Sequence, residues 1–336
     1  MKKRYIQAAF LLLLVAGSIF VIRQQQSLPY QKNQGKIFGT YYTIIYQHDS
    51  NLERDIQSVL NKVDASLSAF NKESVISRIN RNEQVRPDDM FLNVFELGQA
   101  ISAETDGAFD MTVAPLVNAW GFGFKNDVQP TPHAIDSLRQ FVGYKKVRLH
   151  LGKIQKDDPR LQLDCAAIAK GYGCDCVADL LRKNGIKNFI VEIGGEIVAS
   201  GINSERLPWR IAVVKPTDDT LNIKNELQTT LNITDKALAT SGNYRNFYYK
   251  GGRKYAHTIN PYTGYPVQHS LLSATVVASN CTTADAFATA FMVMGMDKAK
   301  AVLEKRKDLM AYFIYADQKG ETAVWFSPAL RDKLPE

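Results

Sequence analysis

A carboxylate and a hydroxyl group stand four residues apart in a segment that is predicted to begin a helix. The segment runs from Thr282 to Thr289 and contains Asp285. Residues at positions i and i+4 of a helix share one face, with Cβ atoms about 5–6 Å apart. Two hard oxygen atoms so placed can bind one magnesium ion, which prefers oxygen ligands and keeps positions open for substrate phosphates. Thr282 and Asp285 also fit a helix-capping box, and Thr289 could donate to the carbonyl group of Asp285, so a purely structural role stays open.

Two further segments carry groups that could complete such a site. Asp164 is predicted to end one strand and to open a helix, where its carboxylate would also serve as the N-cap. Lys170 follows six residues later, and its compact charge suits a phosphate group. His257 opens a turn-rich segment, and a histidine, with an ordinary pKa of about 6.5, can take a proton from a hydroxyl group. A solvated lysine and a structural histidine are the ordinary alternatives.

The elements that must position these groups follow from the spacing of apolar residues. The predicted helices are 51–68, 89–105, 131–140, 168–184 and 284–295. The predicted strands are 39–46, 147–151, 161–164, 189–193, 197–199, 210–214 and 273–278. Residues 109–124 are aromatic and punctuated by glycine, which predicts a ligand-facing loop. Strands and helices mix without strict βαβ alternation, which is typical of an α+β fold with mixed sheets and flanking helices.

The N-terminus differs in character from the rest of the chain. Lys2, Lys3 and Arg4 precede the apolar residues 5–22, a pattern typical of an export signal. A helix of that length spans roughly 27 Å, which suffices for a bilayer core. We therefore predict an apolar N-terminal helix, with a signal or membrane anchor over residues 1–23. Cleavage near Ala16-Gly17-Ser18 stays open, although the continuing apolar run favours an uncleaved anchor.

The charge pattern and composition predict that the chain after residue 23 lies outside the membrane. Basic residues keep the N-terminal end in the cytoplasm, so the predicted location is the inner membrane, with the body on the periplasmic side. Residues 24–35 are polar and patternless and predict a linker, and residues 36–336 contain no further linker and predict one domain. Of the formal net charge of +7, four charges lie within residues 2–23, which leaves +3 for the body. Without a dense basic stripe, we expect no binding of nucleic acid.

Taken together, these segments resemble the ApbE family of FAD:protein FMN transferases. The resemblance extends from Gly39 to about Gly295, and it is specific because nine motifs occur in the same order. The motifs are Gly39-Thr40, Ser68 to Ser74, Gly107 to Thr112, Pro115 to Gly123, Asp164 to Gly171, Gly194-Gly195, Thr240 to Gly242, His257 to Pro266 and Ala284 to Thr289. The resemblance implies a single ApbE-like domain.

The resemblance also implies a reaction. Enzymes of this family split FAD at its pyrophosphate, transfer FMN to a threonine hydroxyl of a partner protein, here expected to be a membrane redox subunit, and release AMP. The implied ligands of Mg²⁺ are the side chains of Asp285 and Thr289 and the carbonyl group of Ala167, and the implied acid–base residue is His257. The implied contacts of FAD are Phe38, Phe70, Ala108, Phe109, Asp110, Asp164, Lys170 and Ile259.

Some points remain open at this level. Aromatic residues such as Phe70, Phe109 and Tyr244 are expected to pack on the flavin or the adenine. Asn260 stands where the family often has aspartate, which removes a negative charge, so we assign it no catalytic role. Two alternative functions are hydrolysis of FAD to FMN and AMP, and binding of FAD without turnover.

Overall fold

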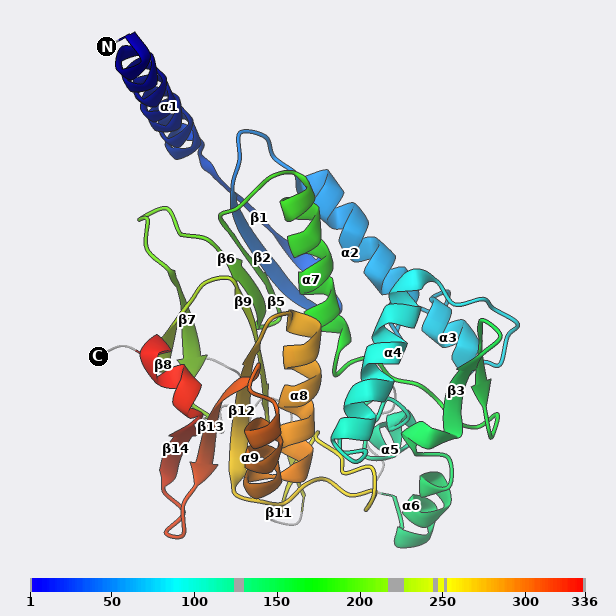
Figure 1. Ribbon diagram of the computed structural model, residues 1–336. Coiled ribbons are helices and arrows are strands. Elements are labelled where there is room, and N and C mark those ends of the chain that lie inside the picture. Colours follow the sequence, from blue (N-terminus) through cyan, green and yellow to red (C-terminus); the bar gives the residue numbers. More distant parts are fainter. Residues whose placement is uncertain (1, 124–129, 217–226, 244–246, 251–252, 335–336) are drawn as a thin grey trace.

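The centre of the molecule is a sheet of eight strands (Figure 1). The structure is a computed structural model and describes residues 2–123, 130–216, 227–243, 247–250 and 253–334. The strand order is β1-β2-β5-β6-β9-β12-β13-β14, and each neighbouring pair is antiparallel. The bounds are β1 Tyr30–Ile37, β2 Thr40–Gln47, β5 Phe189–Ile193, β6 Glu196–Ser200, β9 Lys236–Gly242, β12 Leu271–Ala278, β13 Met310–Ala316 and β14 Thr322–Phe326.

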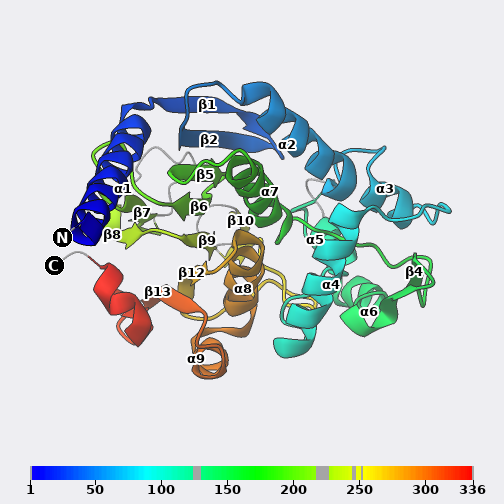
Figure 2. The ribbon, with the colours of Figure 1, turned by 45° about the horizontal axis from the view of Figure 1, so that its top comes forward.

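Both faces of this sheet are covered. Helices α7 (Ala169–Lys183) and α8 (Cys281–Met294) pack on one face, and the hairpin of β7 (Trp209–Val214) and β8 (Leu227–Ile233) packs on the other (Figure 2). Successive side chains of a strand point to opposite faces. Accordingly, Val198 of β6 packs with the α7 side, whereas Ile197 packs with Trp209 of the hairpin. The expected α+β class is confirmed, although the paired strands of the described residues are all antiparallel rather than mixed.

A group of helices lies beside the sheet (Figure 1). Phe91 and Phe95 of α4 share one core with Phe287 and Phe291 of α8, so this group is packed firmly against the helical face of the sheet. Its elements are α2 Glu53–Leu67, α3 Val75–Asn80, α4 Asp89–Glu104, α5 Ala114–Ala119, α6 Pro132–Arg139, β3 Val147–His150 and β4 Lys153–Lys156. The remaining elements are α9 Met296–Lys305, β10 Phe247–Lys250, β11 Arg253–Ala256 and two 3₁₀ helices, Tyr144–Lys146 and Pro328–Lys333.

The predicted linker, residues 24–35, is divided between the end of α1 and strand β1. Residues 30–35 belong to β1, which pairs with β2 at the edge of the sheet. Asn33 is buried there, donates to Asn51 at 2.9 Å and accepts from the hydroxyl group of Tyr46 at 2.9 Å. The prediction was wrong because an edge strand held by backbone pairing and a buried amide needs no apolar alternation.

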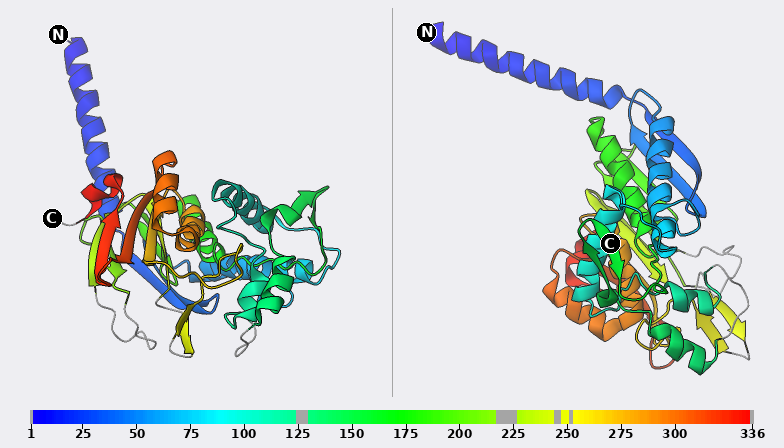
Figure 3. Two further views of the ribbon diagram at one scale, coloured as in Figure 1. Left: turned by 90° about the horizontal axis from the view of Figure 1, so that it is seen from below. Right: turned by 90° about the vertical axis from the view of Figure 1, so that its right-hand side faces the viewer.

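The N-terminal segment forms helix α1, Lys2–Ser27, which projects away from the body (Figure 3). Its described large apolar side chains, such as Leu12 and Leu13, are exposed. The predicted membrane-spanning character is not confirmed: among the described residues, no helix is both long and apolar enough to cross a bilayer.

Candidate active site

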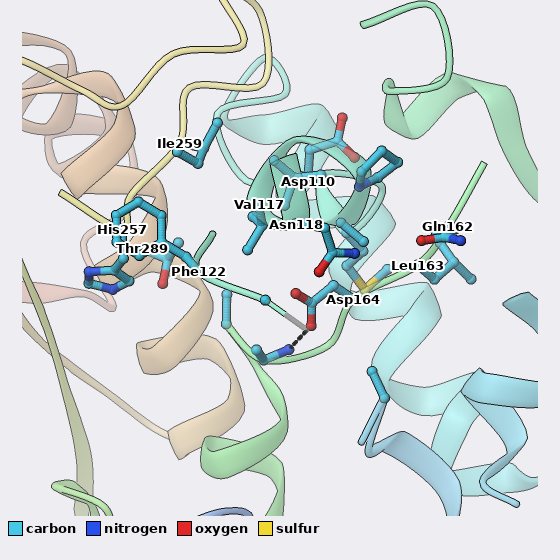
Figure 4. Close-up of a pocket in the computed structure, with 18 of the residues that line it drawn as sticks. Asp110, Val117, Asn118, Phe122, Gln162, Leu163, Asp164, His257, Ile259 and Thr289 are labelled. Carbon is cyan, nitrogen blue, oxygen red and sulfur yellow. Dashed lines mark hydrogen bonds between the residues drawn. The ribbon is translucent and has the colours of Figure 1, made fainter. Parts of the chain in front are cut away.

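One cavity of about 1130 Å³ collects the predicted site residues (Figure 4). It lies between the helical group and the adjoining end of the sheet, and its volume slightly exceeds the usual range for ligand sites, about 300–1,000 Å³. Its wall includes every predicted residue except Phe38, namely Phe70, Ala108, Phe109, Asp110, Asp164, Ala167, Lys170, His257, Ile259, Asp285 and Thr289. Segments more than 200 residues apart in the chain therefore meet at one cavity.

Phe38 lies elsewhere. It occupies the β1–β2 turn with a positive φ of 51°, and its ring packs on α7 beside Gly173. A Cβ atom at Gly173 would lie 2.8 Å from that ring, so the glycine leaves the space that the ring fills. The structure does not bring Phe38 into the cavity, and its contact with FAD stays a prediction. Tyr244 lies outside the described residues.

Helix α8 places Asp285 and Thr289 on the cavity wall. The alternative of a capping box at Thr282 and Asp285 is excluded, because Asn280 is the N-cap and accepts from the N–H of Thr283 at 2.8 Å. Asp285 is therefore free of a capping role. Its Oδ2 instead accepts from the N–H of Gly171 at 3.0 Å, and Thr289 Oγ1 lies 3.1 Å from the hydroxyl oxygen of Ser241 on β9.

A glycine permits the close approach of α7 to α8 at this point. A Cβ atom at Gly171 would lie 2.4 Å from the carbonyl oxygen of Cys281 and 2.9 Å from Cβ of Asp285. Contacts that short do not occur between real atoms, so only glycine fits here. The sequence motif Asp164 to Gly171 thus ends on a residue that brings the two helices, and their site residues, together.

The ammonium group of Lys170 lies between two buried carboxylates. Its Nζ is 3.4 Å from Oε1 of Glu196 and 4.0 Å from Oδ2 of Asp285. Glu196 follows the turn Gly194-Gly195, whose φ values of 64° and 101° suit a two-residue hairpin that requires positive φ at both positions. This tight turn brings the Glu196 side chain to the cavity wall.

Burial and charge act together on these three groups. Burial raises the pKa of Asp285 and of Glu196, and the neighbouring Lys170 only partly offsets this. Burial lowers the pKa of Lys170, but Asp285 and Glu196 outweigh that effect and raise it above its ordinary value. With two carboxylates and one ammonium, the cluster carries an excess of negative charge when all three are ionised, which favours an additional cation.

Asp164 lies on an irregular segment rather than between a strand and a helix. Residues 161–165 form no strand, and α7 begins only at Ala169, so Asp164 is not its N-cap. Its carboxylate accepts from the N–H of Ala166 at 2.7 Å and faces the cavity (Figure 4). Burial raises its pKa, and Lys170 counteracts this in part. The alternation of residues 161–164 was misleading because both apolar residues pack into the core without a neighbouring strand.

The side chain of Asp110 forms hydrogen bonds that stabilise the local structure. Its carboxylate accepts from the N–H of Thr112 at 2.8 Å, from the hydroxyl group of Thr112 at 2.6 Å and from the N–H of Tyr144 at 2.9 Å. Burial still raises the pKa of Asp110. Asp110 thus shapes the wall of the cavity and fixes the start of the 3₁₀ helix, and its contact with FAD stays a prediction.

His257 and Phe122 stand on one wall, across from Gln162 and Leu163 (Figure 4). Their ring centroids are 6.4 Å apart in an edge-to-face arrangement. Phe70 lines the cavity while being 72% exposed, which places this aromatic side chain at the rim. Aromatic groups therefore stand both at the mouth and beside the histidine, where planar rings of a ligand could pack.

The donor atoms fit a hard divalent cation. Asp285 offers a buried carboxylate, Thr289 a hydroxyl group and Ala167 a backbone carbonyl on the same cavity. Oxygen donors of this kind suit Mg²⁺, which binds through one or two carboxylates and retains positions for phosphates. Among the described residues, no three His, Cys, Asp or Glu side chains form a metal-binding group, so a metal here would depend on these mixed oxygen donors.

Several cavity residues received no role from the sequence. Glu196 directly follows the Gly194-Gly195 motif, and a glutamate at the start of a buried strand was the signal that could have found it. Ser241 belongs to a motif but gained a role only through its contact with Thr289. Other lining residues without an assigned role include Lys72, Arg81, Asn118, Arg160 and Gln162.

The cavity combines oxygen donors, an ammonium group and aromatic side chains, which suits a substrate that carries both phosphate groups and planar rings. The sequence model of the ApbE family matches residues 38–313, and the chain belongs to this family.

Individual relatives of known name support this family membership. The chain is 34% identical over 343 residues to the FAD:protein FMN transferase of Escherichia coli K12, with 96% of each protein covered. It is 38% identical over 281 residues to that of Vibrio cholerae, with 80% of this chain and 83% of the relative covered. The solved structure of flavin transferase ApbE from Vibrio cholerae has a TM-score of 0.82 at 34% identity, covering 91% of this chain and 100% of that one.

Proposed function

We propose that this protein is a Mg²⁺-dependent FAD:protein FMN transferase that modifies a threonine hydroxyl and releases AMP. The observation that carries the proposal is the meeting of Asp285, Thr289, Lys170 and His257 on one cavity of dinucleotide size. Its relatives bear the name of this activity.

The reaction needs one bond to form and one to break. The acceptor oxygen attacks the phosphorus of the FMN half of FAD, and the bond from that phosphorus to the bridging oxygen breaks, so AMP leaves with the bridging oxygen. Such transfer depends mainly on positioning and on neutralising charge. His257 is suited to take the proton of the attacking hydroxyl group. Lys170 supplies a positive charge beside the phosphates.

The side chains of Asp285 and Thr289 and the carbonyl group of Ala167 would hold the metal ion. When bound, Mg²⁺ supplies neutralisation of phosphate charge and stabilisation of the leaving group. Asp285 is fixed for this task by the N–H of Gly171, and Thr289 by Ser241. Both ligands are therefore held by neighbouring elements before any ion binds.

The experiment is to incubate the protein with FAD, Mg²⁺ and a candidate acceptor, and to measure the masses of all products. A mass gain of one FMN phosphoester on an acceptor threonine, with one AMP released per modification, is the expected result. Free FMN together with an unmodified acceptor would show that the protein hydrolyses FAD instead. FAD that is bound but chemically unaltered would show that the protein binds FAD without turnover.

We also propose that the body acts on the periplasmic side of the inner membrane, on a membrane redox subunit. The basic residues 2–4 before the apolar residues 5–22 support export. Fractionation of cells that express the full chain, with protease added to spheroplasts, tests this. Protection of the body from protease in intact spheroplasts would contradict it.

A further inference from the structure

Glu196 has an unusual environment for a residue without an assigned role. It is only 4% exposed, yet its Oε2 has no hydrogen-bond partner among the described residues. Leaving a buried polar oxygen unsatisfied is costly. Its other oxygen, Oε1, lies 3.4 Å from Nζ of Lys170, which is longer than a tight charge-assisted hydrogen bond of about 2.7–2.9 Å. The ion pair between Glu196 and Lys170 is therefore long, and Oε2 of Glu196 remains an unused hydrogen-bond acceptor.

The reason lies in the position of Lys170. Its ammonium group also lies 4.0 Å from Oδ2 of Asp285, and it donates weakly to the carbonyl group of Ala166 at 3.4 Å. The lysine is thus shared among three acceptors and reaches none of them closely. Its side chain is 27% exposed, whereas those of Glu196 and Asp285 are 5% and 3% exposed. A lysine side chain also has a flexible four-carbon stem, so it can reorient more readily than a buried carboxylate. Lys170 is the member of the cluster that can move.

We propose that Glu196 is a positioning residue that draws the ammonium group of Lys170 away from Asp285 when Asp285 binds a divalent cation. A cation at Asp285 would repel the ammonium at 4.0 Å. Glu196 offers that ammonium a second buried acceptor, its unpaired Oε2, so the lysine charge stays in the site for the phosphates. This inference rests on the proposed function, because it presumes the metal site at Asp285.

Replacement of Glu196 should therefore weaken metal binding through Lys170. In Glu196→Gln the ammonium loses its alternative partner, stays with Asp285 and competes with the cation. We expect the dissociation constant for Mn²⁺, a hard ion that stands in for Mg²⁺, to rise by about tenfold, the usual scale of coupling between contacting residues. In Lys170→Met no competitor remains, so the ion should bind at least as tightly as in the wild type.

The decisive comparison is the double variant. If Glu196 acts through Lys170, adding Glu196→Gln to Lys170→Met should change the dissociation constant by less than about twofold. The probe is Mn²⁺ alone, with the full chain and no FAD, followed by the EPR signal of the free ion. Glu104→Gln is the matched control. Glu104 forms an ion pair with Arg306, with an N–O distance of 2.7 Å, and it does not line the cavity.

Two outcomes would overturn the inference. Equal weakening by Glu196→Gln with and without Lys170 would mean that Glu196 acts by its own charge or by supporting the fold. Unchanged Mn²⁺ affinity in the single variant Glu196→Gln would exclude any role in metal binding. The variant Asp285→Asn distinguishes failure of this inference from failure of the proposed function. If that variant bound Mn²⁺ as tightly as the wild type, Asp285 would not be a metal ligand and the proposed metal site would be wrong.

Discussion

Asp285 has both a structural role and a proposed chemical role. Its Oδ2 accepts from the N–H of Gly171 and thereby ties α8 to the first turn of α7. That contact orients the carboxylate, and an oriented, buried carboxylate is the only charged protein ligand in the proposed metal site. Its place on the same cavity wall as Thr289 was predictable from the i, i+4 spacing, but its hydrogen bond with Gly171 was not, because that bond joins residues 114 positions apart.

Replacing Asp285 by asparagine should abolish most magnesium-dependent transfer. The amide keeps an acceptor for Gly171 but removes the charge that binds the cation, so we expect a loss of about 10²–10³-fold in rate. The measurement is FMN transfer at several Mg²⁺ concentrations. Asp179→Asn, in an exposed pair with Arg182, is the control. Full activity at low Mg²⁺ in the Asp285 variant would refute the ligand assignment.

Replacing His257 by alanine should separate binding from chemistry. Loss of a general base slows transfer by about 10²–10⁴-fold, while most contacts of FAD on the cavity wall remain. FAD affinity by fluorescence and single-turnover transfer rates are the two measurements, with His150→Ala as the control on an exposed strand position. Wild-type rates would exclude His257 from the mechanism.

At the scale of elements, the irregular segment that carries Asp164 is held in place by neighbouring side chains. The Asn80 amide donates to the carbonyl group of Leu163 at 2.9 Å and accepts from its N–H at 2.7 Å. The ammonium group of Lys156 lies within 3.4 Å of four backbone carbonyl groups, two at the end of α3 and two in the loop 159–161, and shares its three N–H donors among them. These contacts substitute for the sheet pairing that the segment lacks.

Asn80→Ala should consequently loosen this segment. It leaves an N–H and a carbonyl group unpaired next to Asp164, so we expect the free energy of unfolding to fall by about 1–3 kcal/mol and FAD to bind more weakly. Chemical denaturation and FAD titration measure the two effects. Asn93→Ala, which loses one exposed contact at 3.4 Å, should change neither. Unaltered FAD affinity in the Asn80 variant would show that the hydrogen bonds between Asn80 and Leu163 are not needed to position Asp164 for FAD.

Sequence periodicity located the elements with one clear apolar face. Helix α2, predicted as 51–68, spans Glu53–Leu67, and α4, predicted as 89–105, spans Asp89–Glu104. Elements whose stability comes from distant partners were missed. Strand β1 is polar because it is an edge strand, and α5 lies within a segment whose aromatic and glycine content indicated a loop. The pairing of Glu196 with Lys170 also depends on tertiary contact alone.

At the scale of the whole molecule, the body is one packed unit and α1 is an appendage. The core joins the sheet, α7, α8 and the helical group, whereas α1 projects away from them (Figure 3). Just after α1, the carbonyl group of Leu28 accepts from the Gln47 side chain at 3.0 Å, which ties the chain to the sheet. The cavity is therefore built without α1.

Deletion of residues 1–27 should leave the body intact. We expect the free energy of unfolding to change by less than about 0.5 kcal/mol and the rate of transfer to a soluble acceptor to stay the same, because none of the described core residues lies in this segment. Thermal and chemical unfolding together with transfer rates measure this. A lower stability of the truncated protein would mean that α1 packs on the body.

A crystal structure with FAD and Mg²⁺ bound tests most directly whether this cavity holds FAD with its pyrophosphate at the Asp285 end. We predict the pyrophosphate beside Lys170, with the ion between a phosphate oxygen and Asp285 and Thr289, and His257 facing the FMN phosphorus. A dinucleotide bound elsewhere, or one whose phosphates lie at the opposite end of the cavity, would contradict this prediction.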